Sequence, residues 1–102
     1  MSVNEYNDSL PSPGAHVVFT DLDGLAGILV DLNAKKYYQL NEAASLIWRG
    51  LERRLPLSLI AKGMVERYDV ALDQATLSVE TAVRNFEKQN LLGPIKSPAA
   101  PS

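Results

Sequence analysis

The 102-residue sequence contains no cysteine and a single histidine, His16. Without cysteine the chain has no disulfides, thiolate metal sites or cysteine nucleophile. One imidazole leaves little from which to build a histidine zinc site or a Ser–His–Asp triad. No apolar run approaches the ~18 residues that a membrane span needs, and the polar, acidic N-terminus does not resemble a signal or transit peptide. These absences predict a cytoplasmic binding domain that is not an enzyme and uses no metal or cofactor.

The composition of the two ends predicts one domain with a disordered segment on each side. Residues 1–14 are rich in Asn, Ser, Pro and Gly, and residues 93–102 (GPIKSPAAPS) contain three prolines. Neither segment can bury enough apolar surface to offset its ordering entropy. We therefore expect a disordered arm over residues 1–14, an ordered domain over residues 15–92 and a disordered tail over residues 93–102.

Three extended segments are expected at the start of the ordered part. Residues 16–20 (HVVFT) are largely β-branched and aromatic, which is typical of a strand. Residues 27–32 and 36–40 alternate in character, as a half-buried strand does. An Asp-Gly turn over residues 21–27 joins the first two segments, and Asn33–Ala34–Lys35 is a tight-turn candidate before the third, because Asn tolerates positive φ. These connections are short, so the strands form an antiparallel meander.

From Asn41 onward the apolar period becomes helical. We expect Asn41 to cap a first helix that Pro56 ends, Ser58 to cap a second, and a third helix to reach about Asn90. The apolar stripes are Ala44, Ile47, Trp48, Leu51 and Leu55; then Ile60, Ala61, Met64, Val65 and Tyr68; then Ala75, Val79, Ala82, Val83 and Phe86. The predicted fold is α+β, winged helix-turn-helix-like, with a three-stranded antiparallel sheet followed by three helices.

The helix-turn-helix pattern raises the alternative of a DNA-binding regulator. The third predicted helix balances Arg84 and Lys88 with two glutamates. Phosphate attraction dominates DNA affinity, and a chain of pI about 5.3 lacks a strong basic stripe. We therefore expect no nucleic-acid partner, although residues 35–102 carry ten basic and seven acidic groups while residues 1–34 carry five acidic groups and no Lys or Arg.

A second alternative comes from Asp21-Leu22-Asp23-Gly24, which resembles the first motif of haloacid-dehalogenase-type phosphatases. In those enzymes the chemistry lies at the carboxyl ends of parallel strands. Here the next strand follows after a short turn and must be antiparallel. We therefore interpret the segment as an Asp-Gly hairpin turn.

A third possibility concerns the edge of the sheet. An edge strand offers unpaired amide and carbonyl groups, and an extended peptide can add to it as a further strand. If Tyr37–Leu40 forms an edge beside the apolar face of the third helix, the two elements make a groove for such a peptide. An open edge can also pair with a second copy of the chain, which would give a homodimer.

Several segments resemble the PqqD-like family. They are residues 28–32 (ILVDL), 36–44 (KYYQLNEAA) and 46–48 (LIW), with the segment from Val70 to Val79, and the resemblance spans about residues 16–92. Ala71 and Leu72 depart from the family pattern, which favours a capping residue and then Pro. The resemblance implies a recognition element of ribosomal peptide biosynthesis, a non-catalytic chaperone that binds the leader of a precursor peptide. It presents that peptide to a radical S-adenosylmethionine enzyme, as in pyrroloquinoline quinone (PQQ) biosynthesis, or to a leader peptidase, as in lasso-peptide pathways.

The expected binding residues follow from the groove and from this resemblance. The main chain of the edge strand would pair with the leader, the third helix would supply an apolar wall, and nearby cations would attract acidic leader residues. The strand residues are Lys36, Tyr37, Tyr38, Gln39 and Leu40; the wall residues are Val79, Ala82, Val83 and Phe86; the cations are Lys35, Lys36, Arg84 and Lys88.

Overall fold

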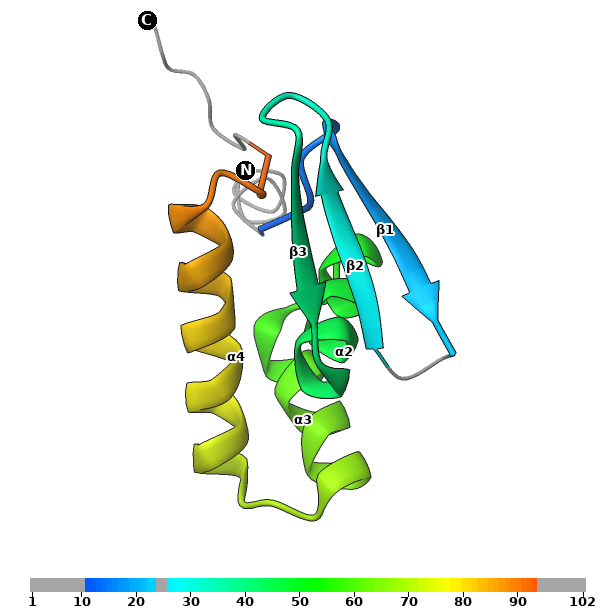
Figure 1. The fold of residues 1–102 in the computed structure, drawn as a ribbon. Coiled ribbons are helices and arrows are strands. Elements are labelled where there is room, and N and C mark those ends of the chain that lie inside the picture. The colour runs from blue at the N-terminus through cyan, green and yellow to red at the C-terminus, as the bar shows by residue number, and fades with distance from the viewer. Residues whose placement is uncertain (1–10, 24–25, 94–102) are drawn as a thin grey trace, which may run out of the picture.

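The computed structural model describes residues 11–23 and 26–93 (Figure 1). The strands β1 (Val17–Leu22), β2 (Ala26–Asp31) and β3 (Lys36–Leu40) precede the helices α2 (Glu42–Glu52), α3 (Leu57–Tyr68) and α4 (Leu72–Lys88). The strands form one sheet of order β1-β2-β3, and both strand pairs are antiparallel. This arrangement confirms the predicted α+β fold. No helix in the described ranges has the length and apolar character of a membrane span.

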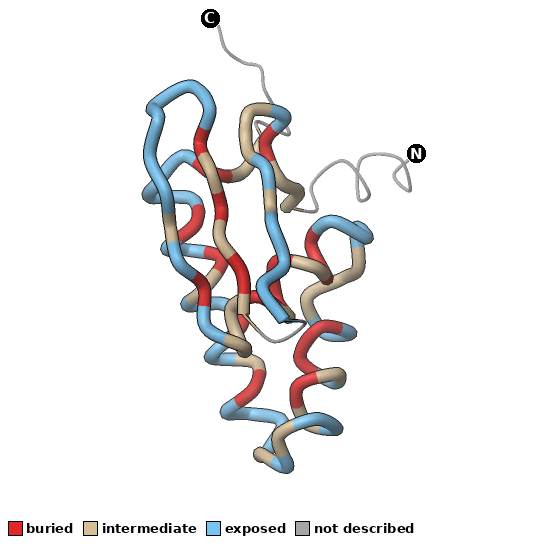
Figure 2. Tube along the Cα trace, turned by 45° about the vertical axis from the view of Figure 1, so that its right-hand side comes forward, coloured by how far each residue is buried: buried red, intermediate tan, exposed pale blue. Residues whose placement is uncertain are grey.

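The molecule has two layers, with the three helices on one face of the sheet (Figures 1 and 2). In the central strand β2, buried residues alternate with half-buried ones along the chain. Leu29 lies in the core and Asp31 shares its face, whereas Ile28 and Val30 lie on the opposite face. The predicted alternation is therefore confirmed, because one face of a strand with period two enters the core.

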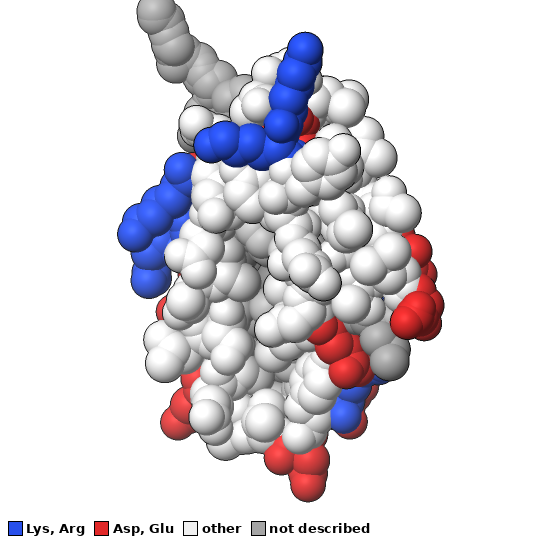
Figure 3. Space-filling view, in the orientation of Figure 1, with Lys and Arg blue, Asp and Glu red and all other residues white. Residues whose placement is uncertain are grey.

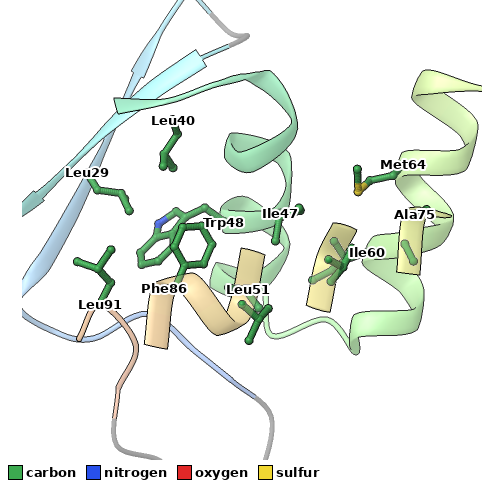
Figure 4. Packing of buried hydrophobic residues seen from close by; sticks show 13 residues of the cluster. Leu29, Leu40, Ile47, Trp48, Leu51, Ile60, Met64, Ala75, Phe86 and Leu91 are labelled. Atoms are coloured by element: carbon green, nitrogen blue, oxygen red, sulfur yellow. The ribbon is translucent and has the colours of Figure 1, made fainter. Parts of the chain in front are cut away.

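The core lies between the sheet and the helices and continues between the helices. Trp48 of α2 and Phe86 of α4 pack edge to face, with ring centroids 5.1 Å apart and an interplanar angle of 82°. Figure 4 shows Leu29, Leu40 and Leu91 around this pair. A second part of the core joins α3 to α4 through Ile60, Met64 and Ala75, all buried. The predicted apolar stripes thus form the core.

The first two turns lie where they were predicted and differ in detail. Strand β1 continues through Leu22, and Asp23 after it is left-handed, with φ 68°. Gly24 of the predicted Asp-Gly turn lies outside the described residues. In the β2–β3 turn the positive φ falls on Lys35, at 59°, and not on Asn33. The buried Asp31 carboxylate accepts hydrogen bonds from the Asn33 and Ala34 amides, at 3.0 and 2.9 Å, so Asp31 fixes this turn from the strand side.

The first helix begins as predicted and ends earlier. The side chain of Asn41 accepts a hydrogen bond from the Ala44 amide at 2.8 Å, which confirms the N-cap. Helix α2 then stops at Glu52, since the Leu55 amide donates to Gly50 O and the Arg54 amide to Leu51 O. These two bonds form a Schellman motif with a left-handed C′ residue, here Arg54 at φ 60°. The helix is therefore already closed before Pro56.

The starts of the other two helices carry no side-chain cap. Pro56, and not Ser58, occupies the N-cap of α3, and Ser58 lies within the first turn. Proline is compatible with the start of a helix for two reasons. Its φ is fixed near the helical value, and the amide it lacks would have no partner within the helix. Helix α4 starts at Leu72 after Ala71, which has no side chain able to accept a hydrogen bond.

Residues 11–14 do not fit the expected loose arm. Pro13 forms an antiparallel bridge with Leu92. The Gly14 amide donates to Leu91 O at 2.9 Å, and the Gly93 amide donates to Ser12 O at 2.7 Å. The paired region therefore extends beyond residues 15–92 at both ends. The rest of the expected arm and tail, residues 1–10 and 94–102, lies outside the described residues.

Candidate peptide-binding groove

Strand β3 is an edge of the sheet, because only β2 pairs with it within the described chain. Its register runs from Asp31 opposite Lys36 to Gly27 opposite Leu40. In an antiparallel ladder, alternate residues direct both main-chain polar groups toward the neighbour, and the residues between them direct theirs outward. Every second residue of β3 thus offers an amide and a carbonyl to another strand.

In Figure 1 the ribbon of α4 is drawn next to that of β3, and the two main chains do not approach closely. No Cα atom of β3 lies within 8 Å of a Cα atom of α4. Neighbouring strands lie about 4.7–4.9 Å apart in the direction of their hydrogen bonds. A further strand paired with β3 would lie at this spacing, on the side of β3 that no described strand occupies.

Helix α4 presents two stripes of side chains. The core stripe is buried and apolar: Ala75, Val79, Val83 and Phe86. The groove stripe is more exposed and lines a surface hollow of about 430 Å³: Gln74, Leu77, Ser78, Thr81, Ala82 and Asn85. Residues from the start of α2 and from α3, including Ala44, Ile47 and Met64, form the rest of the hollow. This face of the molecule is visibly hollowed in Figure 3.

The core stripe corrects part of the predicted apolar wall. Val79, Val83 and Phe86 are exposed by 1%, 7% and 4%, so packing against the sheet and the other helices already occupies their side chains. Ala82 is half-buried and lines the hollow, so it is the predicted wall residue that stays accessible. The helical spacing of apolar residues in α4 therefore identified the face of the helix that packs in the core, and not the face that lines the hollow.

The predicted strand residues divide between the two faces of the sheet. Tyr38 and Leu40 face the helices, and Leu40 is buried while Tyr38 is half-buried. Tyr37, which is 75% exposed, and Gln39 lie on the outer face with Val30 and Ile28 opposite them. No residue of β3 lines the hollow, so what β3 offers a peptide is the main chain of its open edge.

Sequence reasoning missed most of the groove stripe. Five of its residues, Gln74, Leu77, Ser78, Thr81 and Asn85, were not among the expected sites. Polar residues at helical spacing are usual on a solvated face, so they gave no signal. The available signal was Leu77, an apolar residue outside the core stripe that is 61% exposed.

The predicted cations are exposed and lie at one end of this face. Lys35 and Lys36 lie at the β2–β3 turn, and Arg84 and Lys88 lie in the C-terminal half of α4. Figure 3 shows Lys and Arg atoms over these two elements and acidic atoms toward the opposite end of the same face. None of the four cations forms an ion pair with a described residue. The face is therefore polarised along its length.

Asp21, near the end of β1, forms an ion pair with helix α2. The Asp21 carboxylate lies 2.7 Å from the Arg49 guanidinium, which also lies 5.4 Å from the Phe19 ring centroid. The strand that follows is antiparallel, unlike the parallel strands of the phosphatases. No group of three or more metal-ligating side chains occurs among the described residues. His16 Nε2 lies 2.8 Å from the Asn90 carbonyl oxygen, so this histidine joins the start of β1 to the end of α4.

The family model for coenzyme PQQ synthesis protein D (PqqD) matches residues 26–92. The chain belongs to the PqqD family. The match begins with β2 and ends just after α4, so it includes β3, the hollow and both stripes of the last helix. No curated protein matches the chain.

Two solved structures have the fold of this PqqD family member. One is a lasso peptide synthetase B1 complexed with the leader peptide, with 20% sequence identity and a TM-score of 0.76; the alignment covers 84% of this chain and 100% of that one. The other is TbiB1 in complex with the TbiA(beta) leader peptide, with 21% identity and a TM-score of 0.75, covering 87% and 99%. Both similarities establish the fold of the whole domain.

Proposed function

We propose that this PqqD family member is a non-catalytic chaperone for a ribosomally made precursor peptide. The leader segment of the precursor adds as a strand along β3 (Lys36–Leu40), and α4 flanks it on the other side. The bound precursor is then presented to a modifying enzyme, either a radical S-adenosylmethionine enzyme or a leader peptidase.

The observation that carries the proposal is the open edge of β3, which ends next to the hollow that α4 lines. The edge supplies unpaired amides and carbonyls, and the hollow that α4 lines begins at Asn41, directly after β3. Main-chain pairing gives affinity without restricting sequence, while side-chain pockets restrict it. Leu77 and Ala82 line the hollow, and Tyr38 is half-buried on the inner face of β3. We expect these three side chains to select leader side chains.

The similar structures support the same use of the fold. Both B1 proteins are described as complexes with a leader peptide, and each aligns over at least 84% of this chain. Because the cations lie at one end of this face, we expect an acidic stretch of the leader to bind toward the β2–β3 turn, near Lys35, Lys36 and Lys88. Such charges accelerate association more than they raise affinity.

The test uses the leader of the precursor encoded beside this gene and isothermal titration calorimetry with the full chain. We expect micromolar or tighter binding, with amide shifts concentrated in Lys36–Leu40 and in α4. Leader variants carrying one N-methyl group each provide the sharper readout. Strand addition predicts strong loss of binding at every second residue of the paired segment and little loss between, because only alternate amides point at β3.

N-methyl groups outside the paired segment serve as the matched control. Absence of binding to the leader, or losses without a two-residue period, would reject strand addition. Salt-sensitive binding of duplex DNA without leader binding would instead favour the winged-helix regulator.

A further inference from the structure

A second hollow lies between α2 and α3, and it shares no lining residue with the groove. Its volume is about 280 Å³. Cavities of about 150 Å³ already hold a benzene molecule, so this α2–α3 pocket has room for a large apolar side chain. Helix α2 lies between the two hollows, with Ala43, Ala44 and Ile47 lining the groove and Leu46, Arg49 and Arg53 lining the pocket.

The pocket combines an apolar floor with a cationic rim. Leu46, Leu55, Leu59 and Ile60 form apolar lining, and Leu59 is 48% exposed although it is a large aliphatic residue. Among the lining residues, the hydroxyl of the buried Ser45 has no hydrogen-bond partner within the described chain. Exposed apolar surface with a polar rim is typical of protein–protein contact sites.

The rim carries more positive than negative charge. Its charged residues are three arginines and one glutamate: Arg49, Arg53, Arg67 and Glu42. The Arg67 guanidinium lies 3.0 Å from the Glu42 carboxylate, and this hydrogen bond raises the pKa of Arg67. Arg49 pairs with Asp21. The Arg53 guanidinium pairs with no carboxylate of the described residues, so it is available to an external anion.

We propose that the α2–α3 pocket docks the modifying enzyme through an apolar side chain flanked by a carboxylate. The apolar side chain enters the hollow beside Leu59 and Ile60, and the carboxylate meets Arg53. The proposal rests on the function proposed above and names the surface for its second partner. Because the pocket and the groove use different sides of α2, leader and enzyme bind at the same time, which a presenting chaperone requires.

Gly63 offers a substitution that fills the pocket without disturbing the fold. It lines the pocket within α3, and a Cβ atom added there meets nothing within 4 Å. Gly63→Leu places an aliphatic side chain in the hollow, and Gly63→Ala adds only the Cβ. Both substitutions raise the helix propensity of α3, so both variants are expected to melt at or above the temperature of the unsubstituted chain.

The assay measures binding of the full chain to the immobilised enzyme encoded beside the gene, with and without the leader. We expect Gly63→Leu to weaken enzyme binding about tenfold or more and Gly63→Ala about twofold or less. Both variants should bind the leader with unchanged affinity. If Gly63→Leu binds both the leader and the enzyme as tightly as the unsubstituted chain does, the docking proposal is wrong. The chaperone proposal then remains intact.

A charge pair tests the rim. Arg53→Glu should weaken enzyme binding about tenfold, and the matched control Arg54→Glu, next in the chain but outside the pocket, about threefold or less. Equal losses for the two variants, or no binding of the enzyme to the unsubstituted chain, would contradict the proposal. Two further outcomes would contradict it. Loss of leader binding in Gly63→Leu would assign the pocket to the leader. A dimer in solution that Gly63→Leu dissociates would assign the pocket to a second copy of the chain.

Discussion

The core stripe and the groove stripe of α4 run along the same helix and differ in composition and surroundings. The core stripe is apolar and meets Trp48, Ile60 and other core residues, whereas the groove stripe mixes amides, hydroxyls and single apolar residues around the hollow. The comparison shows that the strongest apolar pattern in the helix marks where the domain packs against itself. The groove stripe is exposed to water when no peptide is bound, so it contains fewer apolar residues and shows a weaker apolar pattern.

The difference also separates two kinds of free energy. Burial of the core stripe contributes to the free energy of unfolding, because roughly 25 cal/mol is gained per Å² of apolar surface removed from water. The groove stripe remains largely exposed in the free protein, so its apolar area contributes only when a partner covers it. Substitutions in the two stripes should therefore separate stability from binding.

The largest expected effect is on the core stripe. Phe86→Ala removes the edge-to-face contact with Trp48 and leaves a cavity beneath the sheet, so we expect the free energy of unfolding to fall by about 3–5 kcal/mol. Urea denaturation followed by circular dichroism measures this change. A loss below about 1 kcal/mol would mean that the two stripes do not differ in their contribution to stability.

The next effect is on the groove stripe. Leu77→Glu places a charge in the hollow, and we expect leader affinity to fall about tenfold, or about 1.4 kcal/mol, while stability changes by no more than about 0.5 kcal/mol. Leu72→Glu is the matched control, because Leu72 is also an exposed leucine of α4, at 53%, and does not line the hollow. Calorimetry with the leader gives the affinities. Equal losses for the two variants would remove the distinction between the hollow and the rest of the exposed helix.

A third substitution stabilises α4 without touching either stripe. Ala71 occupies the N-cap with no side-chain hydrogen bond, and Ala71→Asp supplies an acceptor for the free amides of the first turn. We expect a gain of about 1 kcal/mol in the free energy of unfolding. Thermal and urea denaturation measure the gain, and leader affinity should stay within about twofold. An affinity that rises with the stability would indicate that helix order, and not the groove stripe, limits binding.

The smallest effect concerns the charged end of the face. Lys88→Glu should slow leader association a few-fold at low salt and leave dissociation nearly unchanged, since exposed charges act mainly on the encounter. Stopped-flow kinetics at two ionic strengths measure this, and salt should reduce the difference. Lys62→Glu, an exposed lysine of α3 that lines neither hollow, is the control. The same slowing in both variants would assign the effect to net charge alone.

The sequence predicted the fold well because its periodicities are strong. The alternation around Leu29 and the helical stripes through Trp48 and Phe86 each place buried residues correctly. Cap chemistry succeeded where a side chain acts locally, as at Asn41. The main-chain edge of β3 was also predictable, because the last strand of a meander has one free side.

Other features depend on tertiary structure and left little trace in the sequence. Arg54 and Lys35 adopt positive φ although neither is glycine or asparagine, because Schellman bonds close α2 and Asp31 closes the β2–β3 turn. The division of α4 between core and groove depends on how far the helix stands from β3, which no local pattern encodes. The predicted wall therefore named the core stripe and omitted Leu77.

The pairing of residues 11–14 with residues 91–93 holds the two ends of the described domain together. Because Pro13 and Leu92 are paired, the first and last described residues of the domain lie side by side. A unit with adjacent ends can be inserted into a surface loop of a host protein without forcing the ends of that loop apart. The same adjacency favours circular permutation, in which a short linker joins the ends and a new opening is made elsewhere.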